Sequence, residues 1–268
     1  MLGRACLQAF GPDASGCGRG DFDIADRAGV LAHLSRLSPG LIVNCAAATD
    51  VDRCELDHGY ADTANAVGAS HVAEAAAILG ARLVHISTDF VFGGREGRPY
   101  RETDEPSPLN YYGLSKLKGE RAVLAALPSA LVVRASWLYG DGPGHFPARV
   151  LSWASERSEI RMAADQFGSP TFAEDLARGI RALVATGVQG VFHLAGSGCA
   201  SRYDVAWETL ALAKLNVTVV PVSASEFPSP APRPANTCLD CTKAAGLGVD
   251  LPPWRDGLAR YLRTSGIS

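Results

Sequence analysis

The sequence lacks a long apolar run, an excess of positive charge and a signal-like start. None of its apolar stretches reaches the roughly 18 residues that a membrane-spanning helix needs. Its 25 basic residues stand against 28 acidic ones, so the net charge of −3 implies no basic face for nucleic acid. The first residues contain no hydrophobic segment of a secretory signal. We therefore expect a cytoplasmic protein that binds neither membranes nor nucleic acid.

Cysteine is present but not in a disulfide-like pattern. The seven cysteines are odd in number and scattered along the chain, which indicates free thiols. Cys238 and Cys241 have the spacing of a redox or metal pair, but neither a second pair nor a histidine cluster accompanies them. We predict free thiols and no metal site.

Strand-like and helix-like segments alternate in the first half of the chain. Apolar runs at residues 41–46, 82–87 and 130–135 are typical of buried parallel strands, and residues 60–79 and 112–126 have helical composition. Such alternation predicts an α/β fold with a doubly wound, Rossmann-type parallel sheet covered by helices on both faces.

The second half is less regular. It contains helical segments at 146–157, 172–185 and from Trp254 onward, strand-like runs at 160–163, 191–194 and 217–222, and a proline-rich loop at 227–234. We expect residues 1–137 to form a cofactor-binding domain to which 172–196 return. Residues 138–171 and 197–268 would form a small C-terminal substrate-binding lobe.

Tyr112 and Lys116 are the first chemical signal. Residues four apart on a helix share one face, so the lysine ammonium can approach the tyrosine hydroxyl. A nearby positive charge lowers a phenol's pKa, and the sequence therefore predicts a tyrosine that works as a general acid. A solvated pair on a helix surface is the competing interpretation.

Thr88 supplies context for this pair. It ends the strand-like run 82–87, and ligands in open α/β sheets bind beyond the carboxyl ends of strands. A hydroxyl, a tyrosine and a lysine are the groups needed to hold a ketone oxygen and protonate it while hydride arrives. The alternative is a strand-end hydroxyl that bonds its own backbone.

Six motifs occur in an order that resembles a known family. They are Asn-x-Ala-Ala from residue 44, Ser-Thr-Asp-Phe-Val-Phe at 87–92, the Tyr112–Lys116 pair, Arg-Ala-Ser-Trp-Leu-Tyr at 134–139, Asp-Gln-Phe-Gly-Ser-Pro-Thr at 165–171 and Arg-Pro-Ala-Asn-Thr-Cys-Leu-Asp at 233–240. This order resembles the dTDP-4-dehydrorhamnose reductase branch of the extended short-chain dehydrogenase/reductases. The resemblance runs from about residue 3 to residue 263.

The resemblance implies an activity and roles for individual residues. The activity is reduction of the 4-keto group of a dTDP-linked deoxysugar by NADPH, with NADH as the alternative cofactor and a homodimer as the expected assembly. Tyr112 would donate the proton, Thr88 would hold the carbonyl and Lys116 would bind the nicotinamide ribose. Asn65 would have a structural or water-holding role. The sugar nucleotide would contact Thr88, Asp89, Trp137, Gln166, Arg233 and Asn236, and the cofactor would contact Gly3, Arg19, Asp23, Ile24, Ala46, Ala47, Ala48, Tyr112 and Lys116.

The start of the chain departs from the family. It matches the Gly-rich phosphate turn only from its third glycine, Gly3, so the usual first strand is absent. We expect this absence to leave two neighbouring strands with unpaired edges, to weaken cofactor binding and to destabilise the chain. Either the natural start lies upstream, which the intact downstream motifs favour, or the chain is a decayed or repurposed paralogue.

The next segment gives an indication of cofactor choice. Gly18 and Arg19 stand where NAD-binding proteins carry an acidic residue, and an arginine there suits the 2′-phosphate of NADPH. Two other functions share these motifs: reduction of another nucleotide deoxysugar, as in dihydrostreptose synthesis, and a non-catalytic NADP-binding subunit like the beta subunit of methionine adenosyltransferase. The complete Thr88–Tyr112–Lys116 set argues against the second of these.

Overall fold

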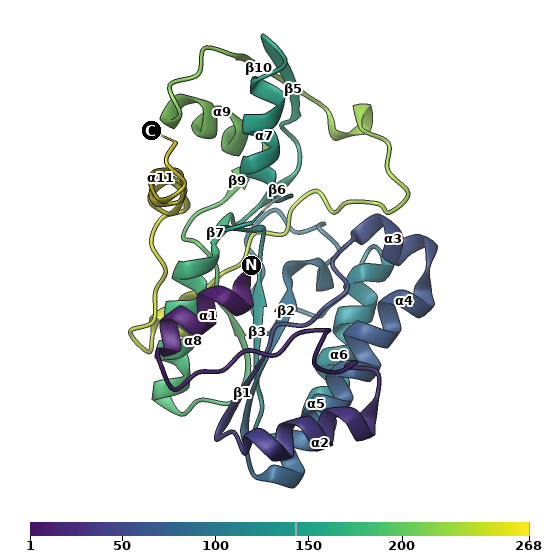
Figure 1. Cartoon of the computed structure of the whole chain (residues 1–268). Helices are drawn as coiled ribbons and strands as arrows, with labels where there is room; N and C mark the ends of the chain where they lie inside the picture. Colours follow the sequence, from purple (N-terminus) through teal and green to yellow (C-terminus); the bar gives the residue numbers. More distant parts are fainter. Residues whose placement is uncertain (143, 268) are drawn as a thin grey trace.

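The centre of the molecule is a parallel sheet of four strands. The structure, a computed structural model, describes residues 1–142 and 144–267. The sheet has the order β1-β2-β3-β8 (Figure 1). Its strands are β1 (Leu41–Asn44), β2 (Arg82–Thr88), β3 (Leu131–Ala135) and β8 (Gly190–His193). Val84 of β2 aligns with Val43 of β1 and with Leu131 of β3, so the apolar runs of the sequence lie side by side.

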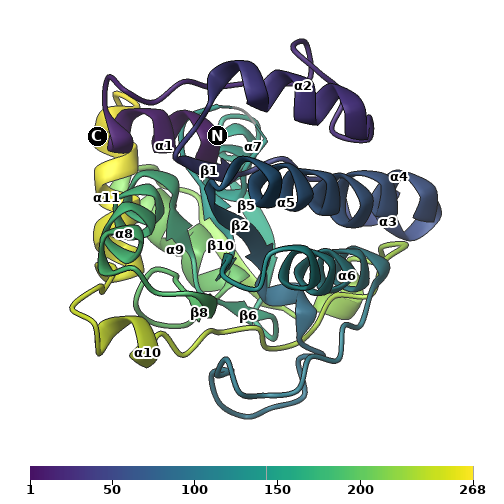
Figure 2. The same cartoon turned by 90° about the horizontal axis from the view of Figure 1, so that it is seen from below.

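Helices cover both faces of this sheet. On one face, α2 (Arg27–Leu37), α5 (Gly68–Leu79) and α6 (Tyr111–Ala126) bury an apolar cluster that includes Val30, Val72 and Val123. On the other face, α1 (Leu2–Phe10) and α8 (Ala173–Thr186) bury a second cluster. Figure 2 shows the two helical layers on either side of the strands. The predicted doubly wound α/β fold is confirmed.

The remaining elements gather beyond the carboxyl ends of the strands, above the sheet in Figure 1. There, β5 (Glu159–Ala163) pairs in parallel with β10 (Thr218–Val222), and β6 (Phe167–Gly168) pairs antiparallel with β9 (Ala200–Ser201). The helices α7 (Phe146–Ala154) and α9 (Arg202–Leu212) pack on β5 through Val150, Ile160 and Leu210. The predicted helix at 146–157 is shorter than expected, and α9 was not predicted.

Further elements complete the fold. They are α3 (Val51–Leu56), α4 (His58–Asp62), a π-helical turn (Thr63–Val67), a 3₁₀ turn (Asp89–Val91), β4 (Leu138–Tyr139), β7 (Thr171–Phe172), a second 3₁₀ turn (Ala224–Glu226), α10 (Thr242–Ala245) and α11 (Trp254–Thr264). Within residues 1–142 and 144–267, no helix is both long enough and apolar enough to cross a bilayer.

The segment between α1 and α2 differs from the sequence-based expectation. Residues 11–26 form turns and no strand, and β1 is the edge of the four-stranded sheet. The first three residues of β1 are accordingly only partly buried. The prediction of two strands with unpaired edges inside the sheet is wrong, because the second of those strands does not form. The backbone of β1 is left unpaired on one side only.

The cysteine prediction also needs correction. Cys199 and Cys238 form a disulfide, so these two thiols are not free. The two residues are 39 positions apart, and no local pattern signals their pairing. It arises because β6 joins the two segments: Phe167 of β6 pairs with Ser201 of β9 and also bridges to Asn236. Cys241 remains free.

A buried ion pair joins α6 to the sheet. Glu120 of α6 and Arg134 of β3 are 3% and 4% exposed, and their side chains meet at 2.7 Å. Ser87 of β2 donates a hydrogen bond to the same carboxylate, and the Arg134 guanidinium lies 5.1 Å from the centroid of the Phe92 ring. A charge this deep is tolerated because its partner and its hydrogen bonds compensate the loss of water.

We expect Glu120→Ala to lower the free energy of unfolding by about 3–5 kcal/mol, because it leaves the Arg134 cation buried without its partner. Urea denaturation followed by circular dichroism measures this loss. Asp141→Ala is the matched control, since Asp141 pairs with Arg4 at an exposed position, and it should change stability by less than about 0.5 kcal/mol. Equal effects of the two variants would contradict the structural role of the buried pair.

Candidate active site

Two close backbone contacts fix helix α6, which carries Tyr112 and Lys116. A Cβ on Gly113 would lie 2.0 Å from the Phe90 carbonyl oxygen, and one on Gly119 would lie 2.0 Å from the Asn65 carbonyl oxygen. Only glycine allows this approach. The helix begins at Asn110, whose side chain accepts a hydrogen bond from the Gly113 N–H at 2.9 Å. Tyr112 therefore sits directly against the 3₁₀ turn that follows β2.

Asn65 connects α6 to the loop after β1. It lies in the π-helical turn and is completely buried. Its amide accepts from the Ala48 N–H at 2.8 Å and donates to the Ala48 carbonyl at 3.0 Å and to the Ser115 hydroxyl at 2.9 Å. These bonds hold residues 46–48 beside the Tyr112–Lys116 face of α6. They give Asn65 the structural role that the resemblance implied.

Thr88 and Asp89 end β2 beside Tyr112. The Thr88 hydroxyl caps the 3₁₀ turn, accepting from the Phe90 N–H at 3.2 Å, and donates to the Asp89 carboxylate at 3.0 Å. The other Asp89 oxygen accepts hydrogen bonds from the hydroxyls of Ser136 and Thr237. Burial raises the pKa of Asp89, and these three hydroxyl donors oppose that shift. Asp89 thus holds Thr88 in place, and its contact with a sugar stays a prediction.

The pKa of Tyr112 is shifted upward, not downward as the sequence suggested. Burial of the phenol is the main cause, a hydrogen bond with Thr88 opposes it, and the Asp89 carboxylate adds to it. Lys116 does not act on the phenol, because its ammonium donates to the Ile86 carbonyl at 2.6 Å. Tyr112 consequently keeps its proton at neutral pH, as a proton donor must.

Lys116 is a buried cation on the same face of α6. Its side chain is 2% exposed. Burial lowers the pKa of its ammonium to about 8, while the carboxylate of Glu120, one turn further along α6, acts in the opposite direction. His85, fully buried nearby, has its pKa lowered by burial and by the charge of Lys116, so it is neutral. Lys116 is therefore the positive charge on this side of Tyr112.

The start of α1 also lies near the carboxyl ends of the sheet strands. Met1 contacts Gly140, just beyond β4, and no side chain caps the first N–H groups of the helix. Free N–H groups at a helix start are suited to bind a phosphate, so the first turn with Gly3 fits a dinucleotide diphosphate. Figure 1 shows α1 beginning next to the upper end of the sheet.

The other predicted cofactor residues lie further out. Arg19 is exposed in the irregular 11–26 segment. Asp23 accepts a hydrogen bond from the Ala25 N–H, and Ile24 packs on Gly68 at the start of α5. Ala46 and Ala47 follow β1 together with the buried Ala48. The structure places Ile24 on the α5 side of the sheet, and Arg19 in contact with none of the catalytic residues.

The predicted substrate residues lie on several elements. Trp137 follows β3 at the site itself and adopts a φ of 42°, a strained value for a bulky residue. The Gln166 carbonyl accepts from the Arg202 N–H at 3.3 Å on the lobe side. Arg233 forms an ion pair with Asp52 of α3 at 3.0 Å, and its contact with a substrate stays a prediction.

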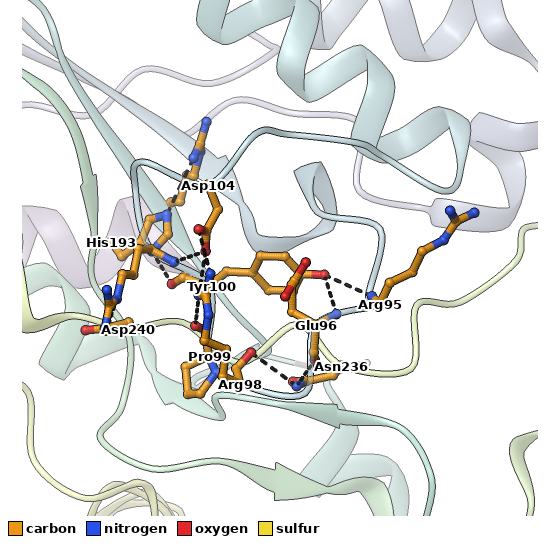
Figure 3. Close-up of polar contacts among 11 residues, drawn as sticks. Arg95, Glu96, Arg98, Pro99, Tyr100, Asp104, His193, Asn236 and Asp240 are labelled. Atoms are coloured by element: carbon orange, nitrogen blue, oxygen red, sulfur yellow. Dashed lines mark hydrogen bonds and ion pairs between the residues drawn. The ribbon is translucent and has the colours of Figure 1, made fainter.

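The side chain of Asn236 also has protein partners. It donates to the Glu96 carbonyl at 2.9 Å, and Figure 3 shows it directed at the backbone of residues 96–98. The Tyr100 hydroxyl accepts from the N–H groups of Arg95 and Glu96, which completes this loop. Asn236 therefore attaches the 95–100 loop to the C-terminal segment, and its contact with a substrate stays a prediction.

A doubly wound sheet with a tyrosine–lysine helix behind its carboxyl ends defines a class, the extended short-chain dehydrogenase/reductases, which are oxidoreductases. The chain belongs to the dTDP-4-dehydrorhamnose reductase family: the family model described as the RmlD substrate binding domain matches residues 1–266.

Relatives and solved structures agree with this assignment. The chain is 44% identical over 230 residues to a dTDP-4-dehydrorhamnose reductase of Mycobacterium tuberculosis, covering 83% of this chain and 76% of the relative. It is similar to the crystal structure of the Clostridium acetobutylicum enzyme of that name, with a TM-score of 0.95, 34% identity and coverage of 99% and 96%. The Bacillus anthracis enzyme, solved in complex with NADP, gives a TM-score of 0.94 at 35% identity, with coverage of 98% and 95%.

Sequence reasoning missed two charged groups next to this site. Glu120 follows Lys116 by four positions, so the helical spacing that connects Tyr112 with Lys116 could have included it. Arg202, which stacks on Trp137, lies in a helix that was not predicted, and no local pattern points to it.

The low pKa of Lys116 leads to a direct titration experiment. With ¹³C-labelled lysine, one of the four lysine side-chain signals should titrate near pH 8, and Lys116→Met should remove it. The ammonium is charged below that pH and neutral above it. Lys118 serves as the internal control, because its bonds to Asp62 and Tyr111 raise its pKa. A midpoint for Lys116 near the unperturbed value of about 10.4 would contradict its burial.

Proposed function

We propose that the chain reduces the 4-keto group of a dTDP-4-dehydro-6-deoxysugar with NADPH, converting dTDP-4-dehydrorhamnose to dTDP-rhamnose. The observation that carries this proposal is the position of Tyr112: a protonated phenol next to Thr88, at the carboxyl end of β2, in a chain of this family. The NADP-bound relative supports the choice of cofactor. The proposed place of reaction is the cytoplasm.

Three side chains would perform the protein's part of the reduction. The Thr88 and Tyr112 hydroxyls would bind the sugar ketone oxygen, and Tyr112 would transfer its proton to that oxygen as the negative charge develops there. The raised pKa of the phenol keeps the proton available until a stronger base, the sugar alkoxide, forms. Lys116 would bind the nicotinamide ribose and supply a nearby positive charge. NADPH, when bound, supplies the hydride.

The two parts of the fold would divide the binding of the two ligands. The sheet with residues 1–137 and 172–196 would hold the cofactor, with the start of α1, residues 46–48 and Lys116 in contact with it. The part above the sheet, residues 138–171 and 197–268, would hold the sugar nucleotide near Trp137 and Gln166. Asp89, Arg233 and Asn236 would order this side through the hydrogen bonds and ion pair described above. A homodimer is the proposed assembly.

Tyr112→Phe removes the proton donor and keeps the ring that packs on Phe90. We expect the turnover number to fall by about 10²–10⁴, with little change in KM, as measured by NADPH oxidation with the keto sugar. Tyr111→Phe is the matched control, because the Tyr111 hydroxyl bonds Asp62 and not the catalytic residues; it should retain turnover within a few-fold. A Tyr112→Phe enzyme as active as the control would remove Tyr112 from the acid role.

Arg19→Ala tests the cofactor side. If the Arg19 guanidinium meets the 2′-phosphate, its loss should raise the KM for NADPH by about tenfold and leave the KM for NADH nearly unchanged, since one charge-assisted hydrogen bond contributes about 1.5–3 kcal/mol. Arg263→Ala, at an exposed arginine of α11, controls for net charge. Parallel changes for the two cofactors would show that Arg19 is only a surface charge.

A further inference from the structure

Arg202 is a cation whose charged group contacts aromatic rings of the protein. The Cζ atom of its guanidinium lies over the Trp137 indole, 3.5 Å from the ring centroid, and 4.8 Å from the centroid of the Phe146 ring. In the chain as described, residues 1–142 and 144–267, this guanidinium forms neither an ion pair nor a hydrogen bond; only the Arg202 backbone N–H bonds, to Gln166. Five N–H donors are therefore free to bind a ligand.

The surroundings of Arg202 are positive. The charges of Arg233 and Arg149 both lower its pKa, which burial brings to about 10. The negative charge of Asp89 acts on this pKa in the opposite direction. The Asp89 oxygens, however, accept hydrogen bonds from three hydroxyls and form no ion pair with Arg202. Arg233 has its own partner in Asp52, whereas no ion pair compensates Arg202 within the described residues, so this side of the site favours an anionic ligand.

The position of Arg202 is rigidly defined. It is the first residue of α9, and the preceding Ser201 forms a capping box with Asp204. The Trp137 indole beneath it is equally fixed, because a Cβ on Gly168 would lie 2.3 Å from the ring and the Trp137 carbonyl accepts from the Thr171 N–H. The strained backbone of Trp137 thus serves to present the indole as a platform for Arg202.

We propose that Arg202, supported by Trp137, binds the diphosphate of the sugar nucleotide. A planar guanidinium binds phosphate oxygens through paired hydrogen bonds, and stacking on an aromatic ring orders it for this purpose. Ser136, the residue before Trp137, bonds the Asp89 carboxylate that also holds Thr88, so the diphosphate would lie on the side of the sheet where Thr88 and Tyr112 would hold the sugar. This inference rests on the proposed function, and it gives Trp137 an additional role as a support for the Arg202 guanidinium.

Calorimetric titration with thymidine diphosphate and with thymidine tests this role. Arg202→Gln should weaken binding of the diphosphate by about 10- to 100-fold, the value of a lost charge-assisted hydrogen bond, and leave thymidine binding unchanged. Arg202→Lys should retain part of the affinity, since it keeps the charge without the paired geometry. Arg255→Gln is the matched control: Arg255 also lies over a tryptophan, Trp254, but forms an ion pair with Glu208. Its affinity should equal that of the wild type.

Three results would overturn the proposal. One is diphosphate affinity within twofold of wild type in Arg202→Gln; another is an equal loss for thymidine, which indicates a purely structural role. The third is weakened NADPH binding with intact diphosphate binding, which assigns Arg202 to the cofactor. Circular dichroism shows whether Arg202→Gln folds. If it does not, the affinities of the wild type and of Arg202→Lys for the two ligands are compared. A wild type that binds thymidine as tightly as thymidine diphosphate would exclude the subsite.

Wild-type turnover of the keto sugar is measured separately. A wild type that binds the diphosphate through Arg202 but does not oxidise NADPH with the keto sugar would remove the proposed reaction and leave the subsite in place. If Arg202→Gln does not change turnover at low substrate concentration, the subsite is removed and the proposed reaction is kept.

Discussion

The buried carboxylate of Asp89 is the interaction on which the site depends. Its two oxygens accept hydrogen bonds from Thr88 at the end of β2, from Ser136 after β3 and from Thr237 in the segment that carries Asn236. Three segments that are far apart in sequence therefore meet at one group. An unsatisfied carboxylate at 2% exposure would be very unfavourable, so the three hydroxyls cannot move independently. This constraint fixes the Thr88 hydroxyl relative to Trp137 and to the segment that carries Asn236.

Helix α6 is the second element whose position is fixed, and two glycines allow this position. Gly113 and Gly119 allow the helix to touch the Phe90 and Asn65 carbonyls, so neither end of its catalytic face can shift without a clash. Tyr112, Lys116 and Glu120 lie on that face at intervals of four residues. Each has a different environment: the phenol meets Thr88, the ammonium meets the Ile86 carbonyl and the carboxylate meets Arg134. One helix thus positions an acid, a cation and a structural anchor together.

The sequence predicted those features that depend on local periodicity. The four sheet strands, α5 with its Gly80 cap, α6 and the Tyr112–Lys116 spacing are all set by residues near one another in the chain. Features set by long-range contact were not predicted. The direction of the Lys116 ammonium depends on a carbonyl of β2, and the Cys199–Cys238 disulfide depends on how the lobe folds. The position of Arg202 depends on its contact with Trp137, which is distant in the sequence. Its helix has a weak apolar stripe, so even its secondary structure had no strong signal.

The charged groups of this protein fall into two kinds, and the difference separates structure from function. Glu120 and Arg134 are as buried as Lys116, but each compensates the other directly. Lys116 has only a carbonyl as hydrogen-bond partner, and its pKa falls from the ordinary 10.5 to about 8. A lowered pKa means that the fold disfavours the charged form, here by roughly 3 kcal/mol. That cost is fully present below pH 8 and decreases as the pH rises toward the pKa of lysine in the unfolded chain.

Arg202 resembles Lys116 in this respect, because burial and the charges of two other arginines lower its pKa. A chain shaped for stability alone would place an apolar side chain at both positions. What binds beside these two cations would account for them: the nicotinamide ribose and the charge that develops on the sugar oxygen for Lys116, and the diphosphate for Arg202.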